Sequence, residues 1–129
     1  MIILDTHTWL FWVDYKLDLL GKRALAAIQN ESVLGVSVIS CWEIGMLVSK
    51  QRIALSTDIQ DWIDKALAYR KIELVELSPQ IAVLSTRLPG EFHGDPSDRM
   101  IVASALKNNC PLVTKDRQIK DWGHVKTIW

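Results

Sequence analysis

Short apolar runs occur at five places along the chain, and each is bounded by polar or turn-forming residues. Met1–Leu4 is typical of the group, because it is too short and too rich in β-branched residues to be a helix. We therefore predict strands rather than helices at these places, with the first two buried and the third weakly alternating. The predicted strands are Met1–Leu4, Val33–Val38, Ile72–Leu77, Pro111–Thr114 and Val125–Ile128.

Helical patterns fill most of the chain between these strands. Ile59–Tyr69 places its apolar residues on one face and its acidic residues off that face, and Ser78 followed by Pro79 is a favoured helix start. A short polar stretch around Asp121 separates the last two strands. The predicted helices are Thr6–Val13, Lys22–Asn30, Ser40–Lys50, Ile59–Tyr69, Pro79 to about Leu88, and a segment capped by Ser97 that ends near Asn108. Helices that alternate with strands predict a parallel α/β/α sandwich, and we expect residues 1–129 to form a single domain.

Composition agrees with a folded chain and restricts its function. Hydrophobic residues make up 49% of the chain and the mean hydropathy is +0.10, which indicates a well-filled core. Lys plus Arg and Asp plus Glu both number 15, so a chain-wide basic surface is excluded, although a local basic patch is not. No apolar run approaches the roughly 20 residues of a membrane span, and no signal peptide precedes Asp5. We expect a soluble cytoplasmic protein with no membrane partner.

Four acidic residues lie where carboxylates can act together: Asp5, Glu43, Asp98 and Asp116. Asp5 and Asp116 follow apolar strands, and Glu43 and Asp98 lie near the starts of helices. In an open α/β sheet such positions meet in one crevice at the carboxyl ends of the strands. Because gathered carboxylates repel one another, a divalent metal ion between them is the expected partner.

Each of these carboxylates also has an ordinary structural explanation. Asp5 could cap the first helix, and Glu43 lies three residues after Ser40, which is the spacing of a capping box. Asp98 suits the positive end of a helix dipole, and Asp116 could be a surface turn residue. Their expected convergence at one edge of the sheet favours a shared site.

The ligand types favour Mg²⁺ or Mn²⁺, because zinc usually takes His or Cys ligands. The three histidines, His7, His93 and His124, have no metal-ligand spacing. A carboxylate-bound Mg²⁺ engages phosphates and activates water, so phosphodiester hydrolysis is the reaction that this site predicts.

Four segments contain the acidic residues and share a further pattern. They are Met1–Leu10 (MIILDTHTWL), Val36–Ile44 (VSVISCWEI), Asp95–Ala105 (DPSDRMIVASA) and Leu112–Asp116 (LVTKD). Together they resemble the PIN-domain ribonucleases, and more specifically the VapC-type toxins of bacterial toxin–antitoxin pairs. The resemblance extends over the whole chain, and Asp-Thr-His-x-x-Leu with Asp-Pro-x-Asp-Arg is its most specific part. Similar proteins often carry an aromatic residue where Ser97 stands.

The resemblance implies a PIN-like α/β/α sandwich and Mg²⁺- or Mn²⁺-dependent cleavage of single-stranded RNA. The family's acidic quartet corresponds to Asp5, Glu43, Asp98 and Asp116. We expect Asp5, Asp98 and Asp116 to hold the metal, directly or through water, and Glu43 to bind a second metal or orient the attacking water. Family members are commonly homodimers that a small cognate antitoxin holds inactive, so both partners are expected here.

Several neighbouring residues have two possible roles. Asp95 could support the site or cap the loop before Pro96, and Thr6 could orient Asp5 or cap the first helix. Arg99 could neutralise the carboxylates, meet the antitoxin or form a surface ion pair. Three basic residues near Asp116 could hold RNA phosphates or belong to a solvated turn; they are Lys115, Arg117 and Lys120.

The chain also holds six tryptophans, more than a small core usually needs. We interpret Trp9 and Trp12, which share one short helix, as candidates for a protein interface.

Three other functions compete with a nuclease. A haloacid-dehalogenase-type phosphatase needs a second Asp two residues after the first, where this chain has His7. A signalling receiver domain needs a phosphoacceptor Asp after its middle strand, whereas Val33–Val38 leads to Ser40 and Glu43. A PIN-like module that binds RNA or a partner without cutting is the remaining alternative, and the intact quartet disfavours it because clustered carboxylates are costly to keep.

Overall fold

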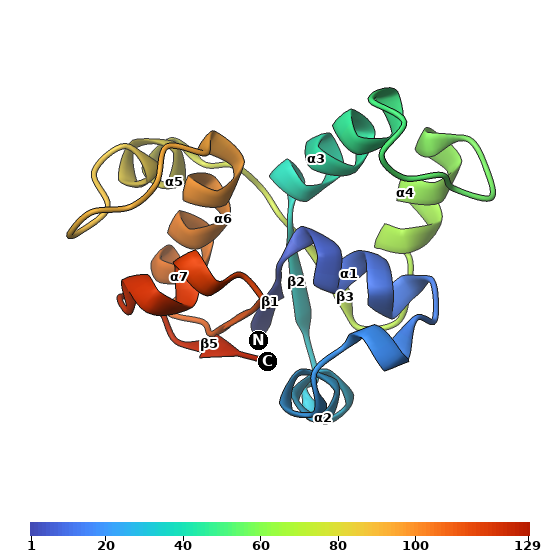
Figure 1. The fold of residues 1–129 in the computed structure, drawn as a ribbon, viewed down its shortest axis with the longest axis horizontal. Coiled ribbons are helices and arrows are strands. Elements are labelled where there is room, and N and C mark those ends of the chain that lie inside the picture. The colour runs from blue at the N-terminus through green and yellow to red at the C-terminus, as the bar shows by residue number, and fades with distance from the viewer.

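Five parallel strands form one sheet in the order β3-β2-β1-β4-β5 in the computed structural model, which describes residues 1–129 throughout (Figure 1). The strands are β1 Ile2–Leu4, β2 Leu34–Ser37, β3 Ile72–Val75, β4 Leu112–Val113 and β5 Thr127–Ile128. The helices are α1 Thr6–Val13, α2 Lys22–Asn30, α3 Val38–Ser49, α4 Ile59–Leu67, α5 Pro79–Ser85, α6 Pro96–Lys107 and α7 Arg117–Trp122, with a short 3-10 helix at Leu17–Leu19. The predicted parallel α/β/α sandwich is confirmed.

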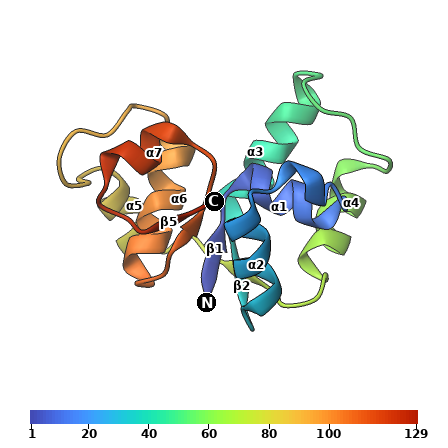
Figure 2. The ribbon, with the colours of Figure 1, turned by 60° about the horizontal axis from the view of Figure 1, so that its bottom comes forward.

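Helices cover both faces of the sheet, and the core is correspondingly divided in two. Along β1, Ile2 and Leu4 join one buried cluster while Ile3 joins the other, because successive strand residues point to opposite faces. Figures 1 and 2 show α1, α2 and α4 on one side and α5, α6 and α7 on the other. Burial on both faces explains why the central strands β1, β2 and β4 contain no charged residue, whereas the edge strand β3 carries the exposed Glu73.

The carboxyl ends of the central strands lie level with one another. Leu4 at the end of β1 pairs with Val36 of β2 on one side and with Val113 of β4 on the other. The chain that leaves β1 and β2 enters α1 and α3, and α3 packs against both α1 and α6. The starts of three helices are thereby brought to one edge of the sheet (Figure 1).

Two predictions about local structure are wrong. The polar stretch between the last two strands is the helix α7, which Asp116 caps at its start and Gly123 ends in the left-handed conformation, with φ of 76°. The helix α6 begins two residues earlier than predicted, with Asp95 rather than Ser97 as its cap. In both places an Asp carboxylate accepts hydrogen bonds from backbone N–H groups of the first turn, and this is how a short polar segment becomes helical.

The interpretation of Trp9 as an interface residue is also wrong. Trp9 is fully buried, and its ring packs edge-on against Trp62 at 5.3 Å between centroids. Trp12 is partly buried and packs edge-on against Tyr69. These tryptophans therefore fill the core between α1 and α4. No helix has the length and apolar character needed to cross a membrane.

Candidate functional site

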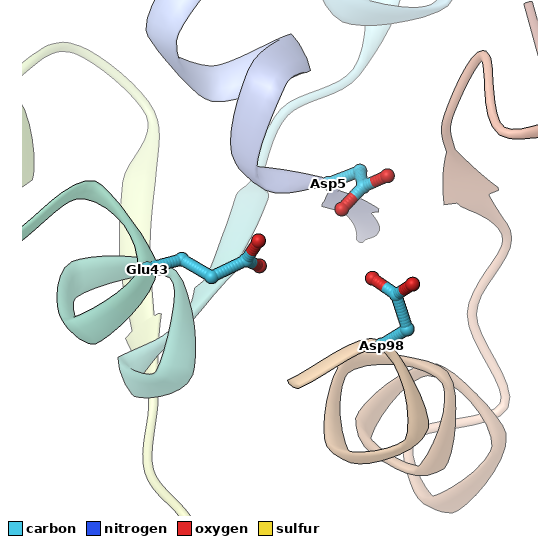
Figure 3. A group of neighbouring side chains, drawn as sticks. All are labelled: Asp5, Glu43 and Asp98. Carbon is cyan, nitrogen blue, oxygen red and sulfur yellow. The ribbon is translucent and has the colours of Figure 1, made fainter. Parts of the chain in front are cut away.

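Three of the four predicted carboxylates converge at the carboxyl edge of the sheet. Asp5, Glu43 and Asp98 each offer one oxygen, and these oxygens all lie within 4.8 Å of one another. Figure 3 shows the three side chains pointing toward one another from the start of α1, from α3 and from the start of α6. They line a cavity of about 380 Å³ whose lining contains no apolar residue. The lining consists of Asp5, His7, Thr8, Glu43, Asp95, Asp98, Lys115 and Asp116.

Asp5 is held through both of its carboxylate oxygens. It is the N-cap of α1, and its Oδ1 accepts a hydrogen bond from the Thr6 backbone N–H at 2.8 Å. Its Oδ2 accepts a hydrogen bond from the Thr114 hydroxyl at 2.6 Å. Burial raises the pKa of Asp5, and the charge of Asp116 adds to this, while the bond from Thr114 opposes it. Asp5 is thus both the predicted cap of α1 and a side chain held in one orientation in the lining of the cavity.

Glu43 faces the cavity rather than the backbone of its own helix. The capping-box explanation is wrong, because Ser37 caps α3 and Ser40 is buried inside that helix. The Thr6 hydroxyl instead donates a hydrogen bond to Glu43 Oε1 at 2.7 Å, and lies 3.0 Å from the Ser40 hydroxyl. Burial, together with the charges of Asp5 and Asp98, raises the pKa of Glu43 to about 7.

Asp98 lies in the first turn of α6, as the helix-dipole argument predicted, and it also has a specific partner. His93 Nε2 donates a hydrogen bond to Asp98 Oδ2 at 2.8 Å. Burial raises the pKa of Asp98 to about 6, against the effect of this hydrogen bond, and the charges of Asp95 and Asp5 add to the shift. His93 therefore fixes one oxygen of Asp98 and leaves the other directed at the cavity.

Asp116 lines the same cavity but lies outside the close group of three. Its Oδ1 accepts hydrogen bonds from the backbone N–H groups of Gln118 at 2.8 Å and Ile119 at 3.3 Å. Its own N–H donates to the Thr114 hydroxyl at 3.1 Å, so Thr114 links Asp116 to Asp5. It is thus the cap of α7 rather than a residue of an irregular turn. The close group of three contains Glu43 with Asp5 and Asp98. The sequence had instead predicted Asp116 as the third metal ligand beside Asp5 and Asp98.

The chemistry of this donor set fits a hard divalent cation. All the converging groups are carboxylates, which are the ligands that Mg²⁺ and Mn²⁺ prefer. No lysine or arginine forms an ion pair with any of the four. Burial, and after it the charges of neighbouring carboxylates, raises the pKa values of Asp5, Glu43 and Asp98, so a cation at this site would favour their ionised forms. Lys115, the lysine in the cavity lining, lies over the Phe11 ring at 5.2 Å from its centroid.

The structure distinguishes between the alternative roles of the residues that surround the four carboxylates. Thr6 meets two carboxylates, Asp5 through its N–H and Glu43 through its hydroxyl. Asp95 is the cap of α6, and hydrogen bonds from the Ser97 hydroxyl at 2.7 Å and the Asp98 N–H lower its pKa. Arg99 forms no ion pair with the carboxylates or at the surface, because its guanidinium donates to the backbone carbonyls of Ser85, Phe92 and His93; its contact with the antitoxin stays a prediction. Of the three basic residues near Asp116, only Lys115 lines the cavity.

Two residues of the site were missed by the sequence argument. His93 stands five positions before Asp98 in a Gly- and Pro-containing loop, and nothing in that spacing indicates the contact. The sequence does contain an indication of the role of Thr114, since it is a polar residue at the end of a buried strand and two positions before Asp116. A buried hydroxyl at such a position must find a partner, and here that partner is Asp5.

Comparison with known proteins agrees with this arrangement. The family model for the PIN domain matches residues 2–125. The chain is 32% identical to ribonuclease VapC22 of Mycobacterium tuberculosis over 130 residues, which cover 99% of this chain and 98% of that protein.

Solved structures with a similar fold include several complexes. A chain of the DNA-bound VapBC complex from Salmonella typhimurium has a TM-score of 0.69 at 19% identity, and covers 98% of this chain and 97% of its own length. A chain of VapBC2 from Rickettsia felis, bound to a DNA fragment from its promoter, has a TM-score of 0.66 at 20% identity and the same coverage. A toxin–antitoxin complex from Klebsiella pneumoniae has a TM-score of 0.64 at 20% identity, covering 96% and 92%. At these identities the likeness concerns the fold.

Proposed function

Because the chain belongs to the PIN domain family and resembles its VapC-type members, we propose that it is a metal-dependent endoribonuclease that cleaves single-stranded RNA. The observation that carries the proposal is the convergence of Asp5, Glu43 and Asp98, with oxygens within 4.8 Å of one another, in a cavity that Asp116 also lines. A polar, acidic cavity of this kind suits a metal that engages a phosphate.

In this proposal Mg²⁺ or Mn²⁺ is held by Asp5, Asp98 and Asp116, directly or through water. The distances favour Asp5 and Asp98 as direct ligands, with Glu43 beside them. Asp116 lines the same cavity outside this close group and would act through water. The bound cation would lower the pKa of water and offset charge on the phosphate oxygens. The hydrogen bonds from Thr114, Thr6 and His93 keep the carboxylates oriented before substrate arrives.

We assign proton transfer to Glu43. Its Oε1 is held by Thr6, which leaves Oε2 free to accept a proton from the attacking water. A carboxyl whose pKa is about 7 is suited to exchange protons near neutral pH. Binding of a second metal ion is the other role open to it.

The test is cleavage of a labelled single-stranded RNA by wild type and by Asp98→Asn. Asparagine keeps the size of the side chain and its position in the first turn, but removes the charge that a metal ligand needs. We expect the variant to lose at least 100-fold in kcat/KM while its circular dichroism is unchanged, and we expect EDTA to abolish wild-type cleavage until Mg²⁺ or Mn²⁺ is restored. If Asp98 served only the helix dipole, the change would cost about 0.3–1 kcal/mol of stability and leave cleavage intact.

The alternative of a PIN-like module that binds without cutting predicts a different result. Wild type would then bind RNA but leave it intact at every metal concentration. An Asp98→Asn preparation purified in the same way shows whether any cleavage comes from a contaminating nuclease. Asp5→Asn serves as an independent second variant, because it touches another helix start and another set of hydrogen bonds.

The proposal includes partners and location. We propose that the protein is the toxin of a toxin–antitoxin pair, that it acts in the cytoplasm as one domain of residues 1–129, and that it forms a homodimer. The similarity to ribonuclease VapC22 supports the toxin assignment. Co-purification with a small protein encoded by the adjacent gene, and loss of RNA cleavage in that complex, would test the antitoxin. Sedimentation that gives a monomer at all accessible concentrations would contradict the homodimer.

A further inference from the structure

A second hollow adjoins the carboxylate cavity. It lies between α3 and the start of α6, has a volume of about 200 Å³, and is lined by Trp42, Met46, Lys50, Arg52 and Pro96 among others; we call it the Trp42 groove. Glu43 and Asp95 line both the groove and the carboxylate cavity, so the two hollows adjoin. A nucleotide next to a phosphate bound in the cavity would therefore lie beside the groove.

The outer face of α3 presents an aromatic surface to this groove. Trp42, Met46 and Lys50 follow one another at intervals of four residues, which places them along one stripe of the helix. Trp42 is 57% exposed, whereas Trp9 on α1 is fully buried. An indole left in water beside an active site is the type of surface on which single-stranded nucleic acids stack their bases.

Basic residues also line the same groove. Lys50 and Arg52 are exposed, and neither forms an ion pair within this chain. Glu43 and Asp95 line the groove as well, and they belong to the carboxylate cavity, where a metal would meet the phosphate that is cut. Since the whole chain has no net charge, local unpaired cations such as these are what the protein can offer to RNA phosphates.

We infer that the Trp42 groove binds the nucleotide next to the scissile phosphate, with its base stacked on Trp42 and its phosphate held by Lys50 and Arg52. This inference rests on the proposed function and adds a subsite to it. The lining that the groove shares with the carboxylate cavity, and the positive charges of the exposed Lys50 and Arg52, which complement a phosphate, favour RNA as its occupant.

The inference is tested by combining Trp42→Ala with RNA that lacks one base. We expect Trp42→Ala to raise KM about tenfold with kcat unchanged, and Trp42→Phe to stay within about threefold of wild type, because a smaller aromatic ring still stacks. With wild type, one abasic position beside the cut site should raise KM about tenfold. In Trp42→Ala the same abasic position should have no further effect, which a purely structural role of Trp42 would not produce.

The matched control is Tyr15→Ala, because Tyr15 is another exposed aromatic residue, at 75%, and lies past the opposite end of α1 from Asp5. It should leave KM unchanged. Binding of the same labelled RNA by fluorescence anisotropy in Ca²⁺ separates this inference from the proposed function: if wild type binds but does not cut, the cleavage proposal fails and the Trp42 comparison still decides the subsite. Equal affinities of wild type and Trp42→Ala, or a dimer that dissociates in Trp42→Ala while RNA affinity is unchanged, would overturn the inference.

Discussion

At the scale of single residues, the site depends on hydroxyl and imidazole groups that hold the carboxylates in place. Thr114 holds Asp5, Thr6 holds Glu43 and His93 holds Asp98. Each of these bonds lowers the pKa of its carboxyl while burial raises it, so the three groups are kept partly charged in a place that disfavours charge. Such supporting residues decide how well a metal site is preorganised.

Thr6 offers the clearest test of this support. Thr6→Val keeps the shape of the side chain but removes the hydrogen bond to Glu43 Oε1, so we expect the pKa of Glu43 to rise further and the metal concentration for half-maximal RNA cleavage to rise about tenfold. Thr6→Ser keeps the hydroxyl and should stay close to wild type. The measurement is a Mn²⁺ titration of cleavage for the three proteins, and equal titration curves for Thr6→Val and wild type would contradict a positioning role.

The sequence located the acidic residues because strand ends and helix starts are visible as patterns, but it could not supply their supporting contacts. The Ser40–Glu43 spacing matched a capping box, yet α3 begins at Val38, and Glu43 therefore turns to the cavity instead. That difference depends on where a helix starts to within two residues, which local patterns do not fix. The His93–Asp98 contact depends on how a loop folds back, and no periodicity encodes it.

At the scale of elements, the loop between α5 and α6 sets the position of His93. This loop has no regular structure, and Arg99 of α6 connects it to the rest of the fold. The Arg99 guanidinium donates to Ser85 O at 2.8 Å, Phe92 O at 3.0 Å and His93 O at 3.2 Å, and it lies over the Phe92 ring. Arg99 thus joins the end of α5 to the residue that contacts Asp98.

We expect Arg99→Lys to lower the free energy of unfolding by about 1–3 kcal/mol, because one ammonium group cannot reproduce the fork of hydrogen bonds that an arginine gives. The loop should also become more sensitive to protease. Urea unfolding and limited proteolysis provide the measurements. Arg87→Lys is the matched control, since Arg87 is exposed and makes no side-chain hydrogen bond, and it should change neither quantity. Equal stability of the Arg99 and Arg87 variants would show that Arg99 does not hold the loop.

At the scale of the whole molecule, the fold gathers like charges at one edge of a sheet whose two faces are covered by helices. The strand order places β1 at the centre, and its end, with those of β2 and β4, brings Asp5, the start of α3 and Thr114 together. The alternation of apolar runs and helical patterns was enough to predict a parallel α/β/α sandwich, but not the order of the strands within its sheet. The burial of these carboxylates, through which stability depends on their protonation, was not visible in the sequence.

In the absence of metal, the protein should become less stable as pH rises from about 4.5 to about 7. Over this range an unfolded chain has already released the protons of Glu43 and Asp98, whose ordinary pKa values are 4.5 and 3.8, whereas the folded protein retains them up to pKa values of about 7 and about 6. The folded state thus binds more protons than the unfolded state, and the free energy of unfolding falls with rising pH. Because solvent screens these half-buried groups, we expect a fall of about 1–2 kcal/mol.

Metal should reverse this dependence, because only the ionised, folded site binds it and binding stabilises the folded state. In EDTA, urea unfolding at pH 5, 6, 7 and 8 should give a single transition whose midpoint decreases, whereas saturating Mg²⁺ or Mn²⁺ should keep the midpoint high at pH 7 and 8. The control is Glu43→Gln, which removes one of the two titrating groups and should flatten the plot of midpoint against pH in EDTA. The difference between the midpoints of the two proteins then gives the contribution of Glu43. A wild-type midpoint that rises between pH 5 and 7 in EDTA would contradict the raised pKa values, and the lack of any metal effect at pH 8 would argue against the four carboxylates as a metal site.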